Sequence, residues 1–128
     1  MSVRTLNEND VQALPLPGRM LRWLANSERI GPKYLSVCVI EVAPGEKVRP
    51  AHSHPNGEEL IYIIRGSGRV MVDGCVEPVR EGSAVLFPQG SIHMLQNTGS
   101  EDMKVVCCFA PPSDLSTYRF FEDVDFPD

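Results

Sequence analysis

Short apolar segments, each ended by glycine or proline, are the feature that most constrains how this chain folds. Residues 34–42, 59–65 and 104–110 are rich in β-branched and other apolar side chains, and each run stops at or near a glycine or proline. Segments of this length and composition are typical of strands, because helices are usually longer. A succession of such strands predicts an all-β sandwich or barrel.

Further strands are expected between these three, and they cover residues 69–72, 75–79, 84–87 and 91–96. The dipeptide Asp73-Gly74 is a strong signal for a two-residue hairpin turn. Pro78 places the returning strand at the edge of a sheet, since proline donates no backbone hydrogen bond. Residues 19–24 fit either a strand or a helical turn, and residues 114–121 show only a weak helical pattern.

The composition of the 128-residue chain is that of one globular domain, with 42% hydrophobic and 23% charged residues. Its net charge of -5 argues against nucleic acid and anionic membranes as partners, because both require a basic face. No stretch approaches the ~20 apolar residues that a membrane span needs. Residues 1–20 show no secretory signal, so a cytoplasmic location is expected.

The four cysteines form no C-x-x-C pair, which disfavours a thiolate zinc site or a redox motif. We expect buried free thiols at Cys38, Cys75, Cys107 and Cys108. Cys107 and Cys108 are adjacent in an apolar run, so in a strand they would point to opposite faces.

The three histidines of the chain are His52, His54 and His93. His52 and His54 are two residues apart, so in an extended chain both imidazoles project from one face. Glu59 follows after a turn, which would return its carboxylate to the side of this pair. His93 begins a later strand. We therefore interpret these four side chains as a metal site inside a β-barrel.

Alternation along residues 59–65 separates two faces of the expected strand. Glu59 shares one face with Ile61 and Ile63, so this carboxylate would stand at the inner wall of an apolar barrel. Glu58 and Tyr62 fall on the opposite face, which favours solvent or an interface for Glu58 and packing for Tyr62.

The sequence also predicts positions for several side chains outside this site. Barrel filling is expected of Met71, Phe87 and Met94. A surface position is expected of Arg49, Arg65 and Arg69, any of which could also steer an anion toward the site. No place in the fold is predicted for Tyr34 and Tyr118.

Three imidazoles and one carboxylate suit one divalent transition metal per chain, Zn, Fe, Ni, Mn or Cu, better than Ca or Mg. With neutral imidazoles, such a site carries one net positive charge. It should therefore favour small molecules with anionic oxygen groups.

These residues resemble the two sequence motifs of the cupin family. The first motif, G-x5-H-x-H-x(3,4)-E-x6-G, is represented with one extra residue after its first glycine by Gly45, His52, His54, Glu59 and Gly66. The second motif, G-x5-P-x-G-x2-H-x3-N, is matched without a gap by Gly82, Pro88, Gly90, His93 and Asn97. Two spaced motifs in agreement make a specific signal.

The resemblance implies a double-stranded β-helix, or jelly roll, with a metal in the barrel mouth. The implied ligands are His52, His54, Glu59 and His93, whereas Asn97 would be structural. It also implies a homodimer. We expect residues 1–24 to form an N-terminal arm or strand at the dimer interface, residues 25–112 the barrel, and residues 113–128 an acidic C-terminal extension in solvent.

Two functions are compatible with this site. The first is a metalloenzyme that acts on a small oxygen-rich anionic metabolite. Because every histidine is used as a ligand, no imidazole is left for acid–base work, which favours Lewis-acid or dioxygen chemistry over histidine-driven sugar epimerisation. The alternative is a non-catalytic module that binds or senses a small molecule such as a sugar or organic acid. Fold alone does not choose between them.

Overall fold

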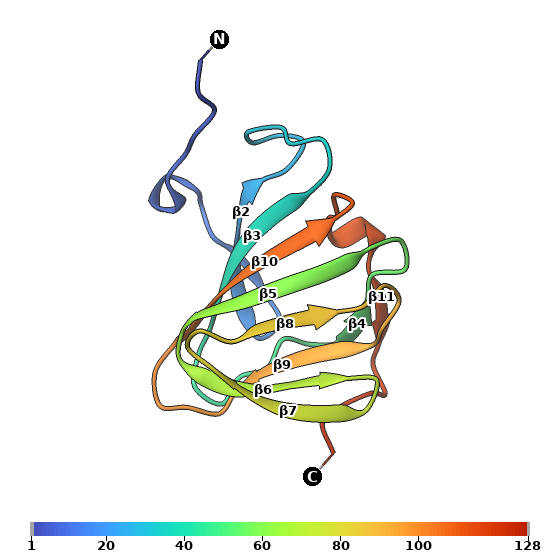
Figure 1. The fold of residues 1–128 in the computed structure, drawn as a ribbon. Coiled ribbons are helices and arrows are strands. Elements are labelled where there is room, and N and C mark those ends of the chain that lie inside the picture. Colours follow the sequence, from blue (N-terminus) through green and yellow to red (C-terminus); the bar gives the residue numbers. More distant parts are fainter. Residues whose placement is uncertain (1, 128) are drawn as a thin grey trace.

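Two antiparallel sheets packed face to face make up the part of the chain that the structure, a computed structural model, describes, residues 2–127 (Figure 1). The first sheet has six strands in the order β1-β2-β3-β10-β5-β8, and the second has five in the order β11-β4-β9-β6-β7. From β3 onward, consecutive strands lie in opposite sheets, except that β6 and β7 form a hairpin in the second sheet. This arrangement confirms the predicted all-β jelly roll.

The strands of the six-stranded sheet are β1 (Leu14–Leu16), β2 (Arg19–Ala25), β3 (Ser36–Val42), β5 (Glu58–Arg65), β8 (Ala84–Phe87) and β10 (Met103–Ala110). Those of the five-stranded sheet are β4 (Ala51–Ser53), β6 (Ser67–Val72), β7 (Cys75–Arg80), β9 (His93–Asn97) and β11 (Arg119–Phe121). Two 3-10 turns, η1 (Glu8–Asp10) and η2 (Leu115–Thr117), complete the elements. Neither turn could span a bilayer, and no other helix occurs in residues 2–127.

The hairpin between β6 and β7 forms where the sequence predicts it. Asp73 and Gly74 both have positive φ angles, 48° and 85°, as a tight two-residue hairpin turn requires. Pro78 lies in β7, the last strand in the order of the five-stranded sheet, as expected for a residue without a backbone donor. β6 can lie close to β9 because residue 68 is glycine: a Cβ there would stand 2.0 Å from the carbonyl oxygen of Gln96.

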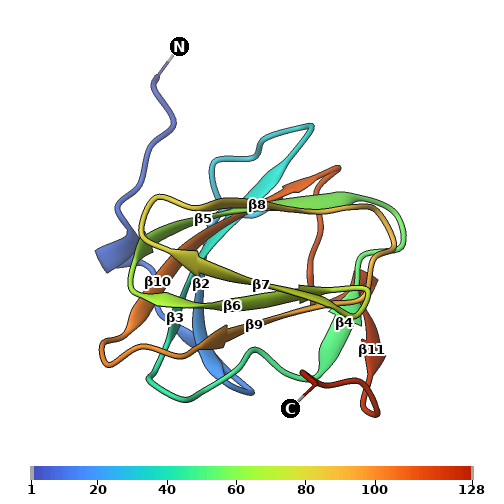
Figure 2. The same ribbon diagram turned by 60° about the horizontal axis from the view of Figure 1, so that its bottom comes forward.

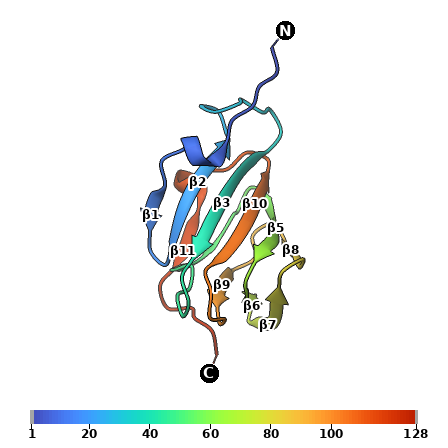
Figure 3. The same cartoon turned by 90° about the vertical axis from the view of Figure 1, so that its left-hand side faces the viewer.

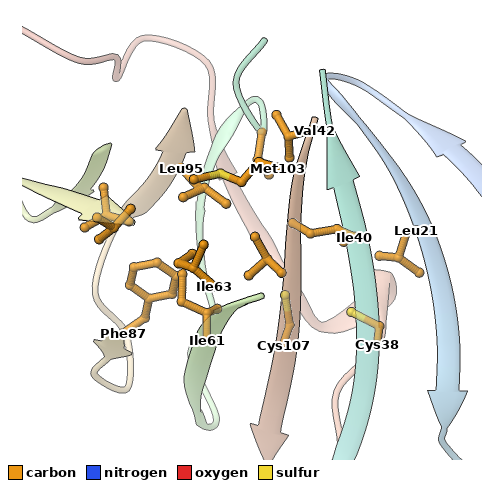
Figure 4. Packing of buried hydrophobic residues seen from close by; sticks show 14 of the residues in the cluster. Leu21, Cys38, Ile40, Val42, Ile61, Ile63, Phe87, Leu95, Met103 and Cys107 are labelled. Carbon is orange, nitrogen blue, oxygen red and sulfur yellow. The ribbon is translucent and has the colours of Figure 1, made fainter. Parts of the chain in front are cut away.

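The main core fills the space between the sheets, and Figure 4 shows its side chains pointing inward from β3, β5 and β10. Ile61 and Ile63 are almost fully buried there, whereas Tyr62 is 49% exposed on the other face of β5. The alternation predicted for this strand is therefore confirmed. Phe87 belongs to the same core.

A second, smaller cluster involves the five-stranded sheet and the C-terminal segment, and it consists of Ala51, Met71, Met94 and Phe126. Met71 and Met94 are buried, but in this cluster rather than the main core, so their prediction as barrel filling is wrong. The prediction of a solvent-exposed tail is also wrong for Phe126, which is 7% exposed. Asp125 forms an ion pair with Lys47, at 2.5 Å, that further attaches the segment.

The residues after β10 follow the second sheet (Figure 2). Residues 114–121 form η2 and then β11, which pairs with β4, instead of a helix. Their weak helical pattern corresponds only to the short 3-10 turn. The sequence missed β11 because three residues are too few for a strand pattern.

The N-terminal segment extends the first sheet (Figure 3). Residues 19–24, which the sequence left open between strand and helical turn, lie in β2 and pair with β3.

The prediction of buried thiols holds for Cys38 and Cys107, while Cys108 is half-buried and Cys75 is exposed. Cys75 lies at the start of edge strand β7, where its side chain meets solvent.

Candidate metal centre

Three separate parts of the chain bring the predicted site residues together. His52 lies on β4 with His54 just after it, Glu59 is the second residue of β5, and His93 is the first of β9. β4 and β9 pair through His52 and His93, so these two imidazoles are cross-strand neighbours. Glu59 reaches them from the opposite sheet. All four residues are buried.

The donor atoms of these four side chains form one compact group, in which all lie within 4.8 Å of one another. The Nε2–H of His54 donates a hydrogen bond to Glu59 Oε1 at 2.9 Å. The Nε2 atom of His93 lies 3.3 Å from the same oxygen. Ligands on opposite sides of one ion lie about 4 Å apart, so the group is close to the spacing that a single ion needs.

Backbone carbonyls orient two of the imidazoles. The Nδ1–H groups of His52 and His93 donate to Pro50 O at 3.2 Å and to Ser91 O at 3.1 Å. These bonds assign the proton to Nδ1 and leave the lone pair on Nε2, the arrangement found in metal-binding histidines. Within residues 2–127, the buried His93 Nε2 has no hydrogen-bond partner. An acceptor nitrogen of this kind fits a metal ion as its missing partner.

The electrostatics of the group favour a neutral imidazole beside an ionised carboxylate. Burial, together with a smaller effect of the neighbouring His93, lowers the pKa of His52 to about 3. Burial alone would raise the pKa of Glu59, but interactions with His54 and His93 outweigh it and hold that pKa well below its usual range. Neutral imidazoles and a carboxylate are the protonation states in which these side chains bind metals.

Aromatic rings enclose the group. Phe87 stacks on His93, with ring centres 4.0 Å apart. Phe109 meets the edge of His54 at 5.1 Å. Tyr118 stacks on His52 at 4.9 Å and contacts His54 at 4.3 Å. These rings hold the imidazoles in place and limit the access of water.

A cavity of about 30 Å³ adjoins the group, and His52, Glu59 and His93 line it. A single water needs about 10–15 Å³, so there is room for an ion with one or two small groups beside it. Arg19 and Tyr118 also line this cavity. The four donors, their close grouping and the adjoining space together fit one bound divalent transition metal.

Among the polar residues that line the cavity, Arg19 and Tyr118 are the two that sequence reasoning missed. The signal for Arg19 was the alternation of Arg19 with Leu21, which share the inner face of β2, but this signal holds only if residues 19–24 form a strand. Tyr118 gave no signal, because it follows a short turn.

The three arginines expected at the surface lie away from the cavity. Arg49 pairs with Glu46 at 2.8 Å, and Arg65 donates to Asp102 O. Arg69 bonds to Gln96 and lies over the ring of Phe126.

Asn97 is fully buried and bonds to backbone groups, including Val42 O at 2.8 Å, so it lies outside the four-donor group. Tyr34 is 79% exposed.

Comparison with known families gives one match that covers more than half of the chain, a cupin domain over residues 38–109. The chain belongs to the cupin family. The matched residues extend from β3 to β10 and include all four members of the candidate metal centre. Residues before 38 and after 109, with Arg19 and Tyr118, lie outside the match.

Curated relatives are similar to this cupin over part of its length. SchB of Streptomyces halstedii is 34% identical over 73 residues, which are 57% of this chain and 52% of that protein. The polyketide synthase protein CurC of Streptomyces cyaneus is 26% identical over 111 residues, 87% of this chain and 71% of that protein. The chain spans about half the length of the first curated relatives that it matches.

Solved structures share the fold of this cupin. The polyketide cyclase RemF of Streptomyces resistomycificus aligns with a TM-score of 0.71 at 23% identity, covering 85% of this chain and 80% of RemF. Oxalate decarboxylase of Bacillus subtilis aligns with a TM-score of 0.81 at 23% identity, covering 94% of this chain but 32% of that enzyme. At these identities the likeness concerns the fold.

Proposed function

We propose that this cupin is a metalloenzyme that acts on a small, oxygen-rich, anionic metabolite. The observation that carries the proposal is the buried group of three imidazoles and one carboxylate that lines a cavity with space beside it. His52, His54, Glu59 and His93 would hold one divalent transition metal. That ion would supply Lewis-acid or dioxygen chemistry.

The residues around the four donors have supporting roles in this proposal. Phe87 and Phe109 exclude water by packing against His93 and His54. Burial and the nearby Glu59 carboxylate raise the pKa of Tyr118, so its phenol stays protonated and can donate a hydrogen bond to a bound molecule. The size of the cavity favours molecules of a few heavy atoms.

Metal analysis and turnover test this proposal. The purified protein should contain about one transition metal per chain, and replacing His52 or His54 with alanine should remove it. Hydroxy acids, oxo acids and catechols are suitable substrates for a turnover screen, with His93→Ala as the inactive control. Metal retained in the His52→Ala and His54→Ala variants would show that the ligand assignment is wrong.

A non-catalytic binding or sensor protein is the second candidate. The observation that favours it is the lack of an available general base: within residues 2–127 every histidine belongs to the donor group, and the pKa of Tyr118 is raised. Binding of these compounds without turnover in the metal-loaded protein would support this candidate over the enzyme.

We also propose a homodimer formed through residues 1–24. Exposed apolar side chains in this segment support it, since Val3 is 87% exposed and Leu14 and Met20 are 43% and 41% exposed. Light scattering on the full chain and on a Met20→Glu variant would test it. A monomeric wild-type protein would contradict the proposal.

A further inference from the structure

Arg19 is a buried arginine that forms no ion pair with a carboxylate in residues 2–127. It is 9% exposed, and its Nη1 donates to the backbone oxygens of Pro17 at 3.1 Å and Arg49 at 3.5 Å. Within residues 2–127, its Nε and Nη2 atoms make no hydrogen bond, and no carboxylate forms an ion pair with it. A buried charge without a paired carboxylate costs stability, and the nearby Glu59 carboxylate, which raises the pKa of Arg19, offsets only part of the effect of burial.

Hydrogen bonds within the protein use only the Nη1 donor of this guanidinium. Holding the carbonyls of Pro17 and Arg49 uses Nη1, and a lysine could do the same. The planar fork of donors that distinguishes arginine from lysine is left unused, and this fork matches the two oxygens of a carboxylate. Burial lowers the pKa of Arg19, yet arginine remains charged throughout the physiological range.

The position of Arg19 places this charge beside the candidate metal centre. β2 directs Arg19 and Leu21 to the same inner side, and both residues line the cavity bounded by His52, Glu59 and His93. The Glu59 carboxylate is already engaged by His54. Arg19 is therefore a charged donor in the cavity wall that faces an acceptor-rich centre.

We propose that Arg19 binds a carboxylate of the substrate inside the barrel, while a second oxygen group of the same molecule reaches the metal. This inference rests on the proposed function and narrows its substrate class. The substrate is a compact acid with a carboxylate at one end and a carboxylate, hydroxyl or oxo group at the other. The small cavity, about 30 Å³, favours the shortest such acids. Arg19 is then the residue that selects the acid.

Calorimetric titration of the zinc-loaded protein with oxalate, malonate and glycolate tests this assignment. Zinc serves as a redox-inert probe metal, so binding is measured without turnover. We expect Arg19→Gln to weaken binding of these acids at least tenfold and to leave zinc affinity within twofold. The matched control is Arg49→Gln, which removes the same charge from an exposed residue paired with Glu46 and should bind the acids as wild type does.

Each outcome is decisive. Wild-type acid affinity in Arg19→Gln, or no binding of any of the three acids by the zinc-loaded wild type, would overturn the role of Arg19. A wild-type protein that fails to bind zinc would instead refute the proposed function. If circular dichroism shows that Arg19→Gln does not fold, Arg19→Lys decides, because it keeps the charge without the planar fork. Binding at least threefold weaker than wild type supports the proposal, and unchanged binding overturns it.

Discussion

The family-matched strands and the two terminal segments meet at one cavity, but they contribute different chemistry to it. β4, β5 and β9 supply the four candidate ligands, whose positions are fixed by pairing, backbone carbonyls and aromatic rings. The terminal segments supply Arg19 and Tyr118, whose free donors face the same space. The first region prepares a cation site, while the second determines what else fits beside it.

This difference has a physical origin. The candidate ligands satisfy one another in part, since His54 bonds to Glu59, so their group persists without a bound molecule. Arg19 carries a buried charge that forms no ion pair with an acidic side chain in residues 2–127, although the Glu59 carboxylate acts on it from nearby. A hydrogen-bond donor that has no acceptor within the protein can donate to a bound ligand instead. The comparison thus separates metal binding from substrate selection.

The largest effect should come from Glu59, which is central to the first region. We expect Glu59→Gln to weaken zinc binding at least about a hundredfold, because losing a ligand costs more than the roughly 10–100-fold seen for outer-shell partners. Titration against a competing chelator would measure it. The adjacent Glu58→Gln removes the same charge from the exposed face of β5 and should stay within about twofold of wild type. If Glu59→Gln and Glu58→Gln weakened zinc binding equally, Glu59 would not be a metal ligand and the contrast between the two regions would fail.

A stability effect without a metal effect is expected from the C-terminal segment. Phe126→Ala removes a buried ring from the cluster with Met71 and Met94, and should lower the free energy of unfolding by about 3 kcal/mol. Zinc affinity should change by less than about twofold, as the cluster does not include the four donors. Denaturant unfolding measures the loss, with the exposed Asp123→Ala as control. A large loss of zinc affinity in Phe126→Ala would show that the two regions are coupled.

Acid should destabilise the metal-free protein through the first region. The unfolded chain protonates His52 near its usual pKa of 6.5, whereas burial lowers the folded pKa to about 3. Between these values the unfolded state binds more protons, so the free energy of unfolding falls as pH falls, by at most about 1.4 kcal/mol per pH unit. Below about pH 4.5, the lowered pKa of Glu59 acts in the same direction.

Chemical denaturation between pH 7 and 4 checks this pH dependence. The slope should decrease in a His52→Gln variant and stay unchanged in Arg49→Gln, because neither arginine nor glutamine titrates in this range. A stability that is independent of pH in the wild type would contradict the protonation states assigned to the site.

The smallest effect is expected at Tyr118. Tyr118→Phe keeps the ring that stacks on His52 and removes only the hydroxyl. Zinc affinity should therefore be unchanged, while acid binding should weaken by about fivefold, the equivalent of one hydrogen bond of about 1 kcal/mol. Calorimetry on the zinc-loaded variant measures both. A loss of zinc affinity would instead indicate that the hydroxyl supports the donors.

The sequence predicted the metal-site region better than the terminal segments, for a physical reason. His52 and His54 share a face because of strand alternation, and the inward direction of Glu59 follows from the same rule with Ile61 and Ile63. Both signals are local and are not overridden by packing. β11 and the burial of Phe126 depend instead on β4 and on Met71 and Met94, which are distant in sequence. Arg19 falls between these cases, since its direction was readable once residues 19–24 were assigned to a strand.

β4 is only three residues long and lies between β9 and β11, so the segment that carries His52 is held on one side by the C-terminal strand. For protein engineering, this makes the carboxyl end a poor attachment point for a purification tag or fusion partner. It also suggests where a library that seeks new specificity should begin: positions on β2 and around Tyr118 can be varied while the four ligand codons stay untouched.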